Sequence, residues 1–276
     1  MTDSISKHSH NNRRTSNEMF FQLIALLLAF IVVHAVFVTV VRPNAETTLR
    51  QHAEMAAAGE DYVVPRSLFI VIKDLEQEAC FILMIWALAI MGYKSRYITA
   101  ARGMLSMPLV SIPEGSTVLP EDSPALSRPL QALPEAQRAQ LLPRALEAAL
   151  SRFQVTESVQ FATEAVDSVC DTENDRLDSE LSMVRYITWA IPSIGFIGTV
   201  RGIGAALSQA HEAMQGDIAG VTSSLGIAFN STFVALLISM VVMFFMHQLQ
   251  LAQERVVLDS QAYCENRLLR FLKIQS

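Results

Sequence analysis

Two threonines, Thr199 and Thr232, stand in stripes of small residues that run along two apolar segments of the chain. The two stripes comprise Pro192, Gly195, Thr199, Gly202 and Ala206 in the first segment, and Ser224, Ala228, Thr232, Ala235 and Ser239 in the second. Steps of three and four residues return to the same face of an α-helix, so each segment presents one small, weakly polar side. Hydroxyls on such a face can bond to a neighbouring helix or contact water and ions.

These stripes have two interpretations on their residues alone. The first is tight packing, because small residues let helix backbones approach closely in a membrane, and Gly198 with Gly202 would support only that. The second is a wall of a hydrated path, with Thr199 and Thr232 as its polar contact points.

Acidic residues are absent from both segments. No Asp or Glu occurs over 183–209 or 221–253, and Arg201 is the one charge within residues 186–207. A proton that crosses the membrane here needs an ionisable side chain to bind to on the way. Because neither segment has an acid, a partner must supply this carboxylate. Arg201 either extends to the membrane interface or pairs with an acid on a neighbouring chain. His34, in an earlier apolar segment, either bonds to a neighbouring helix or relays protons.

Four apolar segments are long enough to span a bilayer, which needs roughly 20 helical residues. They are residues 19–41, 67–93, 186–207 and 225–246, and charged residues over 73–78 interrupt the second. The predicted fold is an all-α membrane protein with four transmembrane helices and a large cytoplasmic helical segment between spans 2 and 3. From Arg144 onward, apolar residues at helical spacing predict one long amphipathic helix that leads into the third span.

Composition excludes several classes of function. Hydrophobic residues make up 51% of the chain and charged residues 17%, and the net charge of -6 is unsuited to nucleic acid. The three cysteines form no CxxC pair, and no nucleotide-binding or hydrolase motif occurs. We therefore expect no enzyme activity, no metal site and no cofactor other than a translocated ion.

Basic residues near the span ends predict the orientation. Lys94, Arg96 and Arg102 follow the second span, whereas the loop over 208–220 holds no Lys or Arg. Both termini and the long connection should therefore be cytoplasmic. The expected parts are a cytoplasmic tail (1–18), spans 1 and 2 (19–93) with a periplasmic loop (42–66), a Pro-rich linker and long helix (94–185), spans 3 and 4 (186–247) and a C-terminal helix (248–276).

The two stripes also resemble conserved stretches of a known family. The segment 191–204 is similar to the "A-P-x-L-G-L-L-G-T-V-x-G" stretch of the MotA/TolQ/ExbB proton channel family, and 224–240 is similar to its "A-L-x-x-T-x-x-G-L" stretch. The resemblance implies that Pro192 opens the channel helix and that Thr199 and Thr232 face the ion path. Two positions depart from the family: Arg201 stands where an aromatic is common, and Ala235 replaces a glycine.

The resemblance further implies a function. Members of this family are ring subunits of inner-membrane motors, or stators, that couple proton or sodium motive force to mechanical work such as motility or protein transport. Five copies would surround two helices of a one-span MotB/TolR/ExbD-type partner, whose aspartate takes up the ion. Two alternatives stay open on the residues alone: a non-conducting membrane scaffold and a small-molecule transporter.

Overall fold

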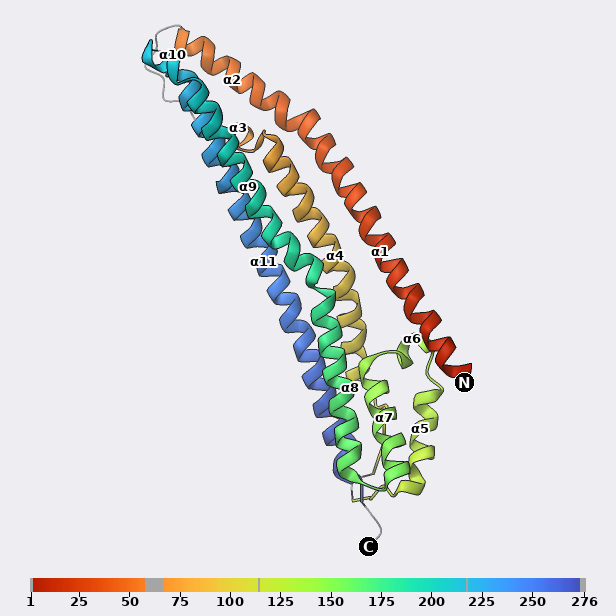
Figure 1. Ribbon diagram of the computed structural model, residues 1–276. Helices are drawn as coiled ribbons and strands as arrows, with labels where there is room; N and C mark the ends of the chain where they lie inside the picture. The colour runs from red at the N-terminus through yellow and green to blue at the C-terminus, as the bar shows by residue number, and fades with distance from the viewer. Residues whose placement is uncertain (1, 58–66, 114, 217, 274–276) are drawn as a thin grey trace. The chain divides into compact units, whose positions relative to one another are not determined.

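The computed structural model describes residues 2–57, 67–113, 115–216 and 218–273, with backbone only for 2–17, 52, 53, 56 and 57. Four stretches are long and apolar enough to cross a membrane: Glu18–Gln51, Leu75–Leu105, Val159–Ser208 and Ala219–Phe271. The predicted all-α fold with four spans is therefore confirmed (Figure 1). In the described ranges, β pairing is limited to an isolated bridge between Val118 and Leu272.

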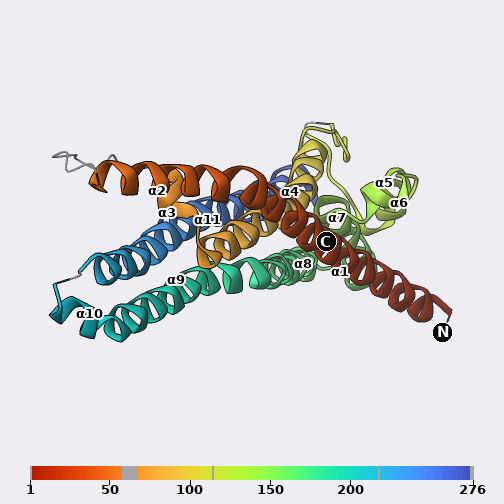
Figure 2. The same ribbon diagram turned by 90° about the horizontal axis from the view of Figure 1, so that it is seen from above.

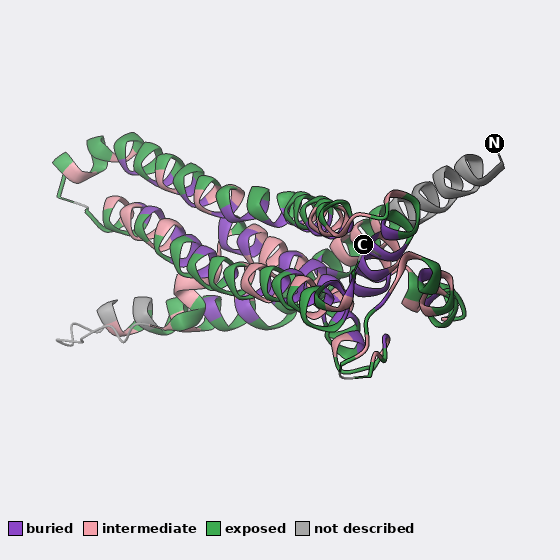
Figure 3. Cartoon of the chain, turned by 90° about the horizontal axis from the view of Figure 1, so that it is seen from below, coloured by how far each residue is buried: buried purple, intermediate pink, exposed green. Residues whose placement is uncertain are grey.

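Two compact units divide the chain. Unit 1 comprises residues 1–91 and 183–245, and unit 2 comprises 92–182 and 246–276. Four helices carry most of unit 1: α1 (Thr2–Val36), α4 (Leu75–Leu105), α9 (Ser182–Ser208) and α11 (Ala219–Arg267), and the last three continue across the division. In Figure 3 the buried residues of unit 1 gather where its helices face one another, and exposed residues cover the outward sides.

The first span continues without a loop. A five-residue π-helix, η1 (Phe37–Val41), joins α1 to α2 (Arg42–Ala57). Pro43 has no N–H to donate to the carbonyl four residues earlier, and the widened turn before it accommodates the ring. The expected loop over 42–66 is therefore wrong for Arg42–Ala57, while 58–66 lies outside the described residues. The expected tail over 1–18 is also helical from Thr2, although its side chains up to residue 17 are outside the description.

The second span is broken near its start. A short helix, α3 (Leu68–Ile72), ends at Lys73, and α4 begins at Leu75. The break coincides with the charged interruption in the sequence, so the predicted span from residue 67 is two helices. α4 also runs past the predicted end at residue 93 to Leu105.

The third and fourth spans are α9 and α11, joined by the short helix α10 (Ala210–Met214). The two long helices run side by side through unit 1 in both ribbon views, where they are teal and blue (Figures 1 and 2). Both exceed their predicted lengths, because apolar residues continue at helical spacing beyond the membrane-spanning windows.

Unit 2 is built around a helical hairpin. The predicted long helix from Arg144 is two helices, α7 (Leu141–Thr156) and α8 (Val159–Glu180). Glu157 separates them with a left-handed φ of 51°, and its N–H donates to Phe153 O, which caps α7. The core between them includes Leu146, Leu150 and Phe153, all 0% exposed.

The rest of unit 2 packs around this hairpin. Short helices within the Pro-rich linker are η2 (Pro120–Asp122), α5 (Ser123–Gln131) and α6 (Glu135–Arg138), and η3 (Leu269–Phe271) follows α11. Prolines lie near the start of several of these helices, where a missing N–H is tolerated. The linker is therefore more helical than its prolines predicted.

A seam of hydroxyls and a polar layer in the membrane unit

The small stripes of α9 and α11 face each other within one chain. A methyl group added at Gly195, Gly198 or Gly202 would lie 2.6, 2.5 or 2.7 Å from a side-chain atom of α11. The α11 atoms it would meet belong to Ala235, Ser231 and Ala228 respectively. The two backbones therefore approach as closely as glycine allows, and these residues form an intrachain packing seam.

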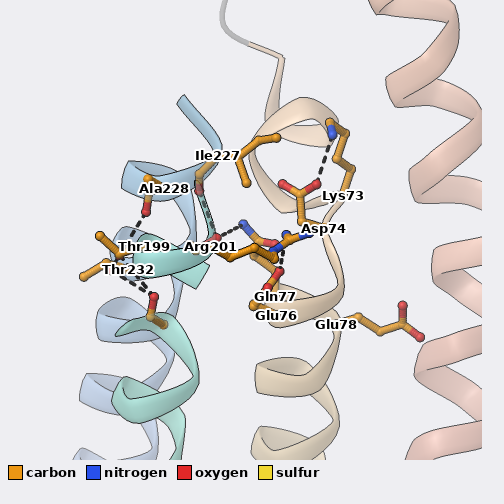
Figure 4. Close-up of polar contacts among 12 residues, drawn as sticks. Lys73, Asp74, Glu76, Gln77, Glu78, Thr199, Arg201, Ile227, Ala228 and Thr232 are labelled. Atoms are coloured by element: carbon orange, nitrogen blue, oxygen red, sulfur yellow. Dashed lines mark hydrogen bonds and ion pairs between the residues drawn. The ribbon is translucent and has the colours of Figure 1, made fainter. Parts of the chain in front are cut away.

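Thr199 and Thr232 meet in this seam. Their hydroxyls bond to each other, and each also contacts a carbonyl of the opposite helix: Thr199 to Ala228 O at 3.2 Å and Thr232 to Gly195 O at 3.1 Å. Figure 4 shows the two side chains next to each other, and both are half-buried. The hydroxyl of Thr199 also lies 3.2 Å from Gly195 O. The two hydroxyl protons of the pair therefore have more acceptors within reach than they can bond at one time. A hydroxyl can therefore exchange one acceptor for another by rotation.

Pro192 and Ser239 are linked through a carbonyl. Pro192 cannot donate to Thr188 O, the acceptor that a residue four positions later normally bonds in a helix. The hydroxyl of Ser239 on α11 lies 3.1 Å from this carbonyl and donates to it. Ser239 is buried, so in this chain the hydroxyl ties α11 to the helix turn that the proline leaves incomplete.

A layer of polar residues crosses unit 1 at the first turn of α4. Glu76, Gln77 and Glu78 are 9%, 0% and 5% exposed. Consecutive residues of an α-helix are about 100° apart around its axis, so three in a row point toward three different neighbours. Figure 4 shows Glu76 and Gln77 directed toward α9 and α11, and Glu78 directed away from them.

The first contact of this layer joins α4 to α9. Glu76 Oε2 accepts a hydrogen bond from the guanidinium of Arg201 at 2.7 Å. The Arg201 side chain is half exposed and that of Glu76 is 10% exposed. The sequence predicted that Arg201 extends to the membrane interface or pairs with an acid on another chain. This prediction is wrong, because the acidic partner of Arg201 lies in the same chain, 125 positions earlier.

The second contact joins α4 to α11. Gln77 Nε2 donates to Val71 O at 3.1 Å and lies 3.5 Å from the hydroxyl of Ser231, the residue before Thr232. Two buried acceptors in this part of the layer, Gln77 Oε1 and Asp74 Oδ2, find no donor among the described residues. Lys73 bonds to the other oxygen of Asp74 at 3.0 Å.

The third contact joins α4 to α1 and α2. Glu78 Oε1 lies 2.6 Å from His34 Nδ1, and Glu78 Oε2 accepts a hydrogen bond from Arg42. His34 therefore bonds to a neighbouring helix, the first of the two roles that its sequence position allowed. Arg42 lies two helical turns beyond His34, so both reach the same carboxylate from one face.

The sequence contains a signal for this layer, but the signal lies in the second span and not in the third and fourth spans, where the small stripes are. Three acids within 74–78 at the start of an apolar stretch are costly in lipid unless they are paired, which was the indication that basic partners would face them. Within the described ranges, no group of three or more His, Cys, Asp or Glu side chains is arranged to hold a metal ion.

Comparison with known proteins relates part of the chain to a protein family. Residues 137–262 match the family model of the MotA/TolQ/ExbB proton channel family. No curated protein and no solved structure matches the chain. The matched segment contains α7 to α10, most of α11 and both threonines, whereas α1 to α4 and the acids of the polar layer lie outside it. Over residues 137–262, this multi-pass membrane chain is therefore similar to the MotA/TolQ/ExbB proton channel family.

Proposed function

We propose that this chain is the ring subunit of an ion-driven motor in the inner membrane. The observation that supports it is the Thr199–Thr232 pair, which lies in the α9–α11 seam inside the family-matched segment. Neither α9 nor α11 supplies a carboxylate at the pair, and Glu76 of α4, which lies beside the seam, is bonded to Arg201. In this proposal the carboxylate that binds the ion therefore belongs to a one-span partner of the MotB/TolR/ExbD type. About five copies of this chain would surround two partner helices, with both termini cytoplasmic.

In this proposal the threonine pair stabilises charge at the wall of the path. The hydroxyl of each threonine can rotate between a backbone carbonyl, Gly195 O or Ala228 O, and the hydroxyl of the other threonine. By the same rotation it can turn toward water or a partner carboxylate. One charge that moves across 100 mV releases about 2.3 kcal/mol, so several ions are required for appreciable mechanical work. The translocated ion is a proton or sodium.

Valine substitution tests the pair. T199V and T232V keep the side-chain volume and remove the hydroxyl, and an interhelical hydrogen bond in a membrane is worth about 0.6 kcal/mol on average. We expect assembly to persist and ion flux to fall at least tenfold in vesicles that contain chain and partner. The matched control is T222V, whose hydroxyl is exposed and, among the described contacts, bonds to the carbonyl of Ile218, the residue just before α11.

The outcomes separate the proposal from its alternatives. Normal flux in both valine variants contradicts a role for the pair in the ion path. Lost flux together with a dissociated ring supports the scaffold alternative, since the hydroxyls would then hold helices together. The transporter alternative is favoured by the α3–α4 break with buried charges beside it, a feature of substrate sites in transporters. It predicts solute uptake without the partner.

A further inference from the structure

Two buried hydrogen-bond acceptors lie one turn apart at the start of α4. Asp74 Oδ2 and Gln77 Oε1 are two of the five buried side-chain atoms that lack a hydrogen-bond partner among the described residues. The carbonyl of Asp74 accepts a bond from Glu78 N at 3.2 Å, so α4 starts from Asp74, and residues three positions apart lie on the same side of a helix. Figure 4 shows both side chains at this end of α4. Two unpaired acceptors on one side of one turn indicate a shared ligand that donates hydrogen bonds.

Neither side chain can satisfy the other. Gln77 Nε2 donates to Val71 O at 3.1 Å, and turning the amide over would place Oε1 against this carbonyl, where both atoms are acceptors. Lys73 donates to Asp74 Oδ1 at 3.0 Å, and a carboxylate paired in this way accepts hydrogen bonds but does not donate them. A buried acceptor without a donor is destabilising, and more so when it is charged. Both oxygens therefore need a donor other than the side chains around them.

We propose that this turn binds one water molecule, which donates one O–H to Asp74 Oδ2 and the other to Gln77 Oε1. A water has the two donors that the two acceptors require, and buried waters in proteins typically bond to two to four such groups. A metal cation would also suit two oxygens, but it would lie close to the ammonium of Lys73, which repels it. The site is enclosed by this chain itself, because both acceptor atoms are buried and Gln77 is 0% exposed. A membrane or a neighbouring copy can therefore only cover it further.

The water completes a chain of hydrogen bonds from the α3–α4 break to α11. Lys73 bonds to Asp74, the water joins Asp74 to Gln77, and Gln77 Nε2 lies 3.5 Å from the hydroxyl of Ser231. The bound water therefore holds the break in the second span against the helix that carries one side of the seam. This role needs neither a partner nor ion flow, so it stands or falls independently of the proposed motor.

The first test detects the water directly. The full chain is labelled with ¹⁵N at its glutamine side chains in lipid nanodiscs, the Gln77 signal is assigned by its loss in Q77M, and magnetisation is transferred from water protons to the amides. We expect a water contact at Gln77 that persists when a water-soluble gadolinium chelate is added and when choline replaces sodium. The control is the exposed Gln215, whose contact with bulk water the chelate should remove. No contact at Gln77, a contact that the chelate removes, or one that needs sodium overturns the proposal.

The second test uses the sign of the coupling between the two side chains. The melting temperatures of D74L, Q77M and D74L/Q77M are compared, so that the bonds each variant loses to Lys73 or to Val71 O cancel.

If one water joins the two side chains, the fall for the double variant should be smaller than the sum of the single falls by at least about 2 °C. Two acceptors without a bridging donor repel each other, so the double variant would then fall by more than the sum. An additive or larger fall therefore overturns the proposal. The matched control is D74L/S239A, which should be additive, because Ser239 lies about 12 Å along α11 from Ser231. If D74L does not fold, the water contact at Gln77 in the wild type decides.

Discussion

Glu76 and Arg201 are 125 positions apart in the sequence, and Oε2 of one lies 2.7 Å from a guanidinium nitrogen of the other. The pair connects a helix outside the family-matched segment to a helix inside it. Glu76 also lies against the seam, because its Cγ would be 3.2 Å from a methyl group at Gly198. The carboxylate therefore reaches Arg201 across a glycine that leaves room for it.

Removing one member of this pair should destabilise the chain. E76Q leaves Arg201 without its counter-charge in an apolar environment, and breaking a buried pair costs about 3–5 kcal/mol. The half-exposed guanidinium places the expected loss at the lower end of that range. Thermal unfolding in detergent would measure it, and R201Q should give a similar loss. The double variant E76Q/R201Q should be more stable than either single one; additive losses would indicate that the two side chains do not interact.

Glycine substitutions in α9 should depend on position. G198A places a methyl group 2.5 Å from Ser231 Cβ, so the two backbones must separate, and overpacking of this kind costs about 1–3 kcal/mol. G204A is the control in the same helix, because a methyl group there meets nothing within 4 Å. It should be neutral or slightly stabilising, since Ala favours a helix over Gly by about 1 kcal/mol. Equal melting temperatures for the two variants would contradict the close seam.

The stripe pattern was enough to predict the helices of the seam and the face on which their small residues lie. It could not say which helix would face each stripe, because a period of 3.6 residues describes one helix at a time. The break at Glu157 was also not predictable, since the apolar spacing of α7 continues in α8 and no Gly or Pro lies between Arg144 and Pro192. Long-range pairs such as Glu78 with His34 need the helices in place before the side chains can be matched.

The hairpin of unit 2 should depend on Phe153. Its side chain is fully buried, and truncation of a buried Phe to Ala costs about 3–5 kcal/mol through lost contacts and a residual cavity. F153A should therefore lower the melting temperature and the yield of the assembled complex. V155A in the same helix is the control, because Val155 is 80% exposed. A fully stable F153A variant would mean that the core collapses around the missing ring.

Cysteine labelling should establish the orientation. The three native cysteines are free and buried, so they should react slowly with a polar maleimide. A cysteine at the exposed Gln215 should be labelled in intact cells by an impermeant reagent, and one at the exposed Thr117 only after lysis. This expectation rests on the basic residues that flank the spans. If only the cysteine at position 117 were labelled in intact cells, the chain would have the opposite orientation in the membrane.

Three adjacent side chains at the start of α4 bond to three different surroundings, and this limits how the helix can move. A rotation of α4 about its own axis by one residue, about 100°, would turn Glu76 away from Arg201, Gln77 away from Ser231 and Glu78 away from His34 at the same time. The three contacts therefore oppose rotation of α4, because a rotation breaks all of them together and not one after another. In the proposed motor, these contacts would pass torque between α4 and the helices bonded to it.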